Sequence, residues 1–267
     1  LRSHPLTTER IADMRMRAPA DTLKSAPPDL RHLLMAARAR ALATSRVDAW
    51  RSMQKQALAQ LQTPAGTAPE RMAVLYQGAV ASLRMQDAAA AQQLQQALYK
   101  VVAGIKTNAG QSLAQRQQIE QVQRVLRLLD ADIAGAQGRW AQVISDTEAA
   151  AALRRPEFLL STQALLNTGK AQQARAQLQA WLAEHSDDAP AWLLLAQTYG
   201  RLGQGAQMAR AQGEAAYAEF DYAMALQYLK SARQLTGADL YEGSILDARI
   251  AQVQAAQKDM DEKLIGS

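Results

Sequence analysis

The sequence predicts an all-α fold built from repeated helical hairpins. The helix formers Ala, Leu, Gln, Arg and Met are abundant, whereas Phe occurs only twice and the β-branched residues that strands favour are scarce. A β-sandwich, a β-barrel or a doubly wound sheet is therefore not expected. The hydrophobic content of 48% and the net charge of only +5 also argue against disorder. Finally, short turns recur between helical segments in the second part of the chain, and 267 residues are ample for a sizeable core.

The first segment, residues 1–28, differs from the rest of the chain. Thr7 or Thr8 can cap a short helix that runs to about Ala18. Prolines at positions 19, 27 and 28 follow and mark a connector, because proline ends one helix and fits the first turn of the next. We interpret residues 1–28 as a linker helix that extends the repeat region at its amino-terminal side.

The second segment, residues 29–68, is predicted to contain one long connecting helix or several shorter ones. Asp29 is a suitable N-cap, and the helical pattern continues to about Gln62. The stretch Thr63-Pro64-Ala65-Gly66-Thr67-Ala68-Pro69 then forms the clearest boundary in the sequence.

The third segment, residues 69–267, is predicted to be a solenoid of helical hairpins. Helical stretches alternate with turns that contain Gly or Asp, and Gly203 lies 34 residues after Gly169. A helix-turn-helix unit that repeats about every 34 residues is the signature of the tetratricopeptide repeat. The predicted turns are Gln86-Asp87, Gly138-Arg139, Gly169-Lys170, Gly203-Gln204 and Phe220-Asp221.

The match to the tetratricopeptide repeat is best in the stretch 190–203. There Trp192, Leu195, Ala196, Tyr199 and Gly203 follow the W-x2-L-G-x2-Y-x3-G spacing, with Ala in place of the first Gly. Small residues let the two helices of a hairpin approach closely, and large residues fill the groove of the next hairpin. Four or five repeats are expected. The helix over 205–219 must then serve two neighbouring hairpins, and a helix over about 239–263 should cap the array.

Fainter copies of this pattern occur on both sides of the best one. Each copy combines small and large apolar residues at helical spacing. These residues are Gly78, Ala90, Leu94 and Ala97, then Leu165, Gly169, Ala174 and Leu178, and finally Ala225, Leu229 and Ala232.

The residues that carry enzyme chemistry are sparse. The chain has no Cys, and its three His residues, His4, His32 and His185, form no H-E-x-x-H pair. Neither a P-loop, a dinucleotide fingerprint nor a G-x-S-x-G elbow occurs. His185 lies in a polar stretch at a predicted helix end, where capping is a better interpretation than metal ligation. We therefore expect no catalytic residues and no cofactor in this chain.

A protein-binding face is predicted on the first helices of the two clearest hairpins. Its inner positions are Leu159, Leu160 and Gln163, and then Leu193, Leu194, Gln197 and Arg201. The residues chosen as the binding site are Leu160, Gln163, Leu194, Gln197 and Arg201. This face is too apolar for a carboxylate clamp and suits an extended or hydrophobic protein segment, or another domain of the same protein.

Charge and hydropathy narrow the range of partners. The basic residues are spread along the whole chain and do not form a stripe with stacking aromatic side chains, so nucleic acid is not an expected partner. No stretch approaches the roughly 18 apolar residues that a membrane span requires, so no span is predicted.

The opening residues suggest a family. The motif His4-Pro5-x4-Arg10-Ile11, followed by a charged helix and a tetratricopeptide array, resembles the rear part of periplasmic zinc metalloproteases of the BepA type. The stretches 192–197 and 247–252 (Asp-Ala-Arg-Ile-x-Gln) are similar to that family's carboxy-terminal region. The resemblance extends from His4 to about Lys263. The H-E-x-x-H peptidase half of the family is absent from this sequence, so we expect a fragment that starts just after it.

The resemblance implies a regulatory role for the chain. His4 would match a family histidine that can enter the zinc site as an additional ligand and close it. Residues 1–28 would be the tail end of the peptidase domain, and zinc would be bound only in the parent protein, a metalloendopeptidase. The implied location is the periplasm, and the implied role is assembly and quality control of outer-membrane proteins.

The partners that the resemblance implies are the peptidase domain of the same protein, and the β-barrel assembly machinery or unfolded barrel substrates. The alternative is a free-standing tetratricopeptide scaffold of a bacterial envelope complex with no protease activity.

Overall fold

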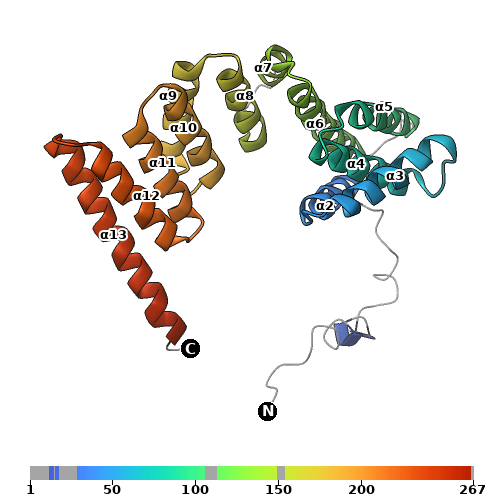
Figure 1. Cartoon of the computed structure of the whole chain (residues 1–267). Helices are drawn as coiled ribbons and strands as arrows, with labels where there is room; N and C mark the ends of the chain where they lie inside the picture. The colour runs from blue at the N-terminus through green and yellow to red at the C-terminus, as the bar shows by residue number, and fades with distance from the viewer. Residues whose placement is uncertain (1–11, 15, 18–28, 106–112, 149–153, 266–267) are drawn as a thin grey trace. The chain divides into compact units, whose positions relative to one another are not determined.

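The computed structural model describes residues 12–14, 16–17, 29–105, 113–148 and 154–265. All regular secondary structure in these ranges is helical, which confirms the predicted all-α class (Figure 1). None of these described helices combines the length and the apolarity that crossing a membrane demands. The chain divides after Ile133 into two compact units, which we describe separately.

Unit 1 is built around α4 (Ala68–Arg84), which contacts α2 (Leu30–Leu42), α3 (Val47–Gln62) and α5 (Ala88–Gly104). Most of α6 (Leu113–Ala136) also belongs to this unit and contributes apolar side chains to the same core. Since α2 and α3 share this core with α4, helices on both sides of the connector at 63–69 pack together. The largest fully buried side chains of this core are Leu34, Met72, Leu75, Tyr76, Leu94, Leu98, Leu126, Leu129 and Ile133.

Helices α2 and α3 are separate, although the sequence allowed one long helix from Asp29 to Gln62. Asp29 caps α2 as predicted, because its carboxylate accepts a hydrogen bond from the backbone N–H three residues later. After α2 ends, the Thr44 hydroxyl accepts a hydrogen bond from the backbone N–H two residues on. The indole N–H of Trp50 donates to the carbonyl oxygen of Ala41 at 2.9 Å and satisfies one of the free carbonyls at the end of α2. Both bonds stabilise a chain reversal instead of a continuous helix.

Gly78 sets the distance between α3 and α4. A Cβ atom at Gly78 would lie 2.2 Å from the Cβ of Ala57, so only glycine permits this approach. The prediction that small residues allow close packing within a hairpin is therefore confirmed at this position.

Unit 2 contains consecutive helical hairpins of the tetratricopeptide type (Figure 1). From α7 to α13 each helix contacts its neighbours in sequence, and α8 also contacts α10. Helix α11 contacts both α10 and α12, as expected for a helix that serves two hairpins, and the last helix ends close to its predicted limit. The helices are α7 (Trp140–Glu148), α8 (Arg155–Asn167), α9 (Ala171–Glu184), α10 (Ala189–Arg201), α11 (Gly205–Ala218), α12 (Tyr222–Leu235) and α13 (Leu240–Ile265).

The predicted turns share one backbone geometry. The residue at the turn has a positive φ, and the following N–H donates to the carbonyl five residues back, which is the Schellman arrangement. Gly237 adds a further turn, 34 residues after Gly203. The φ angles are 60° at Gln86, 72° at Gly138, 78° at Gly169, 71° at Gly203 and 62° at Phe220.

Candidate protein-binding surface

The first helices of the hairpins in unit 2 carry equivalent residues at intervals of 34. On each helix these residues follow the spacing i, i+3, i+7 and i+11, which places them in one stripe. In stacked repeats, equivalent stripes lie on one face. We call this set the repeat face: Pro156, Leu159, Gln163 and Asn167 on α8, Pro190, Leu193, Gln197 and Arg201 on α10, and Met224, Gln227, Ser231 and Leu235 on α12.

The repeat face is both apolar and accessible. Leu193 is 44% exposed, Met224 39% and Leu235 58%. Gln197 and Arg201 are exposed as well, and Arg201 carries the one formal charge of the set. Exposed apolar side chains interspersed with amides can contact the side chains of a bound segment and hydrogen-bond its backbone.

The structure places three of the predicted site residues on this face and two beside it. Gln163, Gln197 and Arg201 belong to it. Leu194 is only 9% exposed and packs in a core cluster, and Leu160 is half-buried. Successive helical residues differ by about 100° in direction, so Leu193 points outward where Leu194 points inward.

Leu194 is therefore a core residue and is not available to a partner. The signal that could have shown this is the repeat itself, since the pattern Pro-x2-Leu-x3-Gln occurs at 156–163 and again at 190–197.

A buried carboxylate fixes the register of α8, α9 and α10. Asp188 caps α10 by accepting from the backbone N–H of Ala191 at 3.2 Å. Its two oxygens also accept from the Arg155 guanidinium at 2.8 and 2.9 Å, and from the indole N–H of Trp181 at 3.0 Å. Burial alone would raise the pKa of Asp188, but the hydrogen bonds from Arg155 and Trp181 hold that pKa below its ordinary value.

Stacked rings support the same hairpin. Phe158 stacks on Trp181 with ring centroids 4.3 Å apart, and His185 stacks on the other side at 3.9 Å. His185 is the C-cap residue of α9, in agreement with its interpretation as a capping residue. Within the described ranges, no three His, Asp or Glu side chains gather as a metal site would require. His4 lies outside the described residues, so its role as a zinc ligand stays a prediction.

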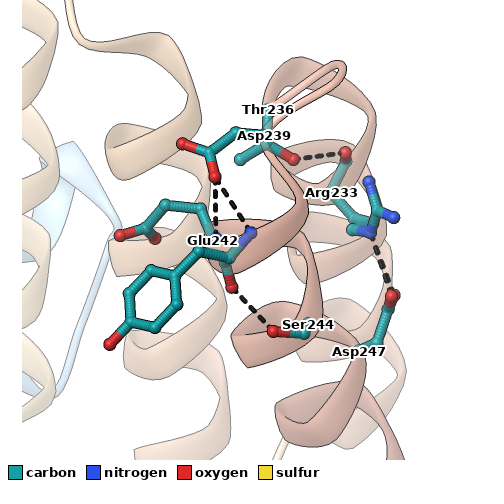
Figure 2. Close-up of polar contacts among 7 residues, drawn as sticks. Arg233, Thr236, Asp239, Glu242, Ser244 and Asp247 are labelled. Atoms are coloured by element: carbon teal, nitrogen blue, oxygen red, sulfur yellow. Dashed lines mark hydrogen bonds and ion pairs between the residues drawn. The ribbon is translucent and has the colours of Figure 1, made fainter.

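Polar contacts anchor the start of α13 (Figure 2). Asp239 accepts hydrogen bonds from the backbone N–H groups of Tyr241 and Glu242 at 3.0 and 3.1 Å. Arg233 on α12 donates through Nε to both oxygens of Asp247 at 3.1 Å. Two residues further along α13, Arg249 pairs with Glu214 at 2.6 Å. Asp247 and Arg249, which belong to the stretch that resembles the protease family, therefore join α13 to the preceding helices.

Comparison with known proteins assigns no family to the chain. A scan against protein-family models finds no match, and a search of the curated proteins finds none either. The assignment of the fold therefore depends on the hairpin geometry, and the assignment of function depends on the surfaces of the two units.

Proposed function

We propose that this chain is a protein-binding module whose repeat face takes an extended, partly apolar segment of another polypeptide. The observation that carries the proposal is the exposure of Leu193, Met224 and Leu235 on successive first helices, in register with amide side chains. Exposed apolar patches on a helical repeat are typical of sites that bind protein segments.

The spacing of the helices suits an extended chain. Packed helices lie about 8–10 Å apart, and an extended chain advances about 3.3 Å per residue. About every third residue of a bound segment would thus meet a new hairpin. Gln163 and Gln197 can hydrogen-bond the segment's backbone, whereas Leu193 offers apolar contact between them. Arg201 at the edge favours an acidic group on the segment.

The test compares two exposed leucines. In the variant Leu193→Glu a charge replaces an apolar contact on the repeat face. In the control Leu240→Glu the same change is made at a residue that is 83% exposed and lies outside that face. Binding is measured with synthetic peptides tiled across an outer-membrane β-barrel protein. We expect Leu193→Glu to weaken binding about tenfold or more, which corresponds to about 1.4 kcal/mol, and the control to match the wild type. Equal binding by both variants would overturn the proposal.

The broader proposal, that this module belongs to a BepA-like periplasmic zinc metalloprotease, rests on the resemblance at His4–Ile11 and 247–252. In that setting the parent protein supplies the zinc and the catalysis, and the module regulates access or presents outer-membrane proteins. A coding sequence upstream of Leu1 that encodes H-E-x-x-H would support this proposal. An upstream sequence without that motif would favour the free-standing envelope scaffold. Casein cleavage by this chain alone, abolished by a chelator, would contradict both.

A further inference from the structure

Unit 1 contains a groove between α3, α4 and α5, well separated in sequence from the repeat face. Its volume is about 600 Å³, within the range of sites that hold peptides or small molecules. Leu61 from α3, Leu75 from α4 and Val101 from α5 supply apolar lining. Arg71 and Lys100 line the same groove and bring two positive charges to it.

The positive charge of the groove is not balanced within it. None of the described residues that line the groove is acidic. The acidic neighbour in sequence, Glu70, is engaged elsewhere, because its carboxylate accepts hydrogen bonds from the backbone N–H and the hydroxyl of Thr67 at 2.8 and 3.0 Å. These bonds form the capping box of α4 and lower the pKa of Glu70.

Arg71 holds a donor that lacks an acceptor. Its Nε is buried, and nothing in the part of the chain that the structure describes accepts a hydrogen bond from it. A buried N–H of a charged group without a partner is costly, and native proteins seldom retain one without a reason. An anionic ligand in the groove would supply the acceptor.

We propose that this groove binds the terminal carboxylate of a peptide whose last side chain is apolar. The Nε–H and a neighbouring Nη–H of an arginine form an edge that matches the two oxygens of a carboxylate. The exposed ammonium of Lys100 adds attraction at the rim. A carboxy-terminal residue places a carboxylate and an apolar side chain within one residue of each other, as the cations and the apolar lining of this groove require.

The site is distinct from the repeat face, and the proposal does not depend on binding there. It predicts a second point of attachment, on a separate unit, that recognises chain ends instead of internal segments. Loss of binding at the repeat face by Leu193→Glu should leave binding in the groove unchanged.

The experiment uses the full chain and the tripeptide N-acetyl-Ala-Ala-Leu, with a free or an amidated carboxyl group, in calorimetric titration. We expect the free acid to bind at least tenfold more tightly than the amide. Arg71→Gln should reduce binding of the free acid at least tenfold, and Lys100→Gln should reduce it less because Lys100 is exposed. The control Lys55→Gln removes an exposed cation of α3 outside the groove and should have no effect.

The outcomes separate the proposal from its competitors. Equal binding of acid and amide, or unchanged binding by a folded Arg71→Gln variant, would overturn it. Inorganic phosphate that binds in an Arg71-dependent manner while the tripeptide does not would also overturn it, in favour of a phosphate site. The melting temperature of Arg71→Gln shows whether the variant is folded. If it is not, Arg71→Lys, which keeps the charge but loses the paired N–H edge, is expected to give the same loss of binding.

Discussion

Replacing Asp188 by Ala should destabilise unit 2 far more than the loss of one helix cap. Asp188 is buried and accepts hydrogen bonds from three places: the backbone of Ala191, the guanidinium of Arg155 and the indole of Trp181. Alanine removes all of these bonds and leaves the indole N–H without an acceptor.

The magnitude follows from the separate contributions. Loss of an N-cap costs about 1 kcal/mol. A half-buried indole N–H without an acceptor adds about 1 kcal/mol. The pair with Arg155, whose side chain is 51% exposed, adds about 1 kcal/mol at most after discounting for solvent. The free energy of unfolding should fall by about 3 kcal/mol, and the melting temperature of the unit should fall by about 10 °C.

Asp221 provides the matched control for this prediction. It caps α12 in the same way, by accepting from the backbone N–H of Met224 at 3.0 Å, and it is exposed. Asp221→Ala should therefore cost only about 1 kcal/mol. Urea denaturation followed by circular dichroism measures both variants. If the two variants lose the same stability, Asp188 acts only as a cap and does not join three helices.

Three further predictions concern single residues of the two cores. Gly78→Ala should lower the free energy of unfolding by about 1–3 kcal/mol in urea denaturation, because the new methyl group would meet Ala57 at 2.2 Å. Leu194→Glu should unfold the region around α10 in hydrogen exchange, whereas Gln197→Glu should change stability by less than about 0.5 kcal/mol. The lowered pKa of Asp188 means that its stabilisation is complete above the unfolded pKa of about 3.9 and is lost as the pH falls through the folded value. Asp188→Asn should therefore be less stable than the wild type at pH 6 and lose less stability on acidification, as thermal melts at several pH values would show.

The turns could be predicted because their signals are local. A residue with positive φ is favoured as Gly, and the following position often begins the next helix. Gln86 and Phe220 are not glycines, yet each precedes an aspartate that caps the next helix: Asp87 accepts from the N–H of Ala90 at 3.0 Å, and Asp221 caps α12. The N-cap preference of aspartate thus reveals the turn even where glycine is absent.

The break between α2 and α3 could not be predicted in the same way. The residues around Thr44 are weak helix formers but do not forbid a helix. What stabilises the reversal is the bond between the Trp50 indole and the carbonyl of Ala41, which exists only after the chain has turned back. The groove beside Arg71 and Lys100 is hidden from the sequence for a related reason. These residues lie 29 positions apart, and the packing of α4 against α5 brings them to one cavity.

The binding face shows what a repeat adds to the information in one helix. Leu193 and Leu194 are both apolar, so α10 alone does not reveal which leucine faces the core, and Leu159 with Leu160 on α8 leaves the same ambiguity. The third copy resolves it. The position 34 residues after Leu193 is Gln227, which is exposed on α12. Because equivalent positions of stacked repeats have the same environment, a glutamine at this position indicates the outward side. Leu193 is therefore exposed for contact with a partner, whereas Leu194 holds the hairpin together.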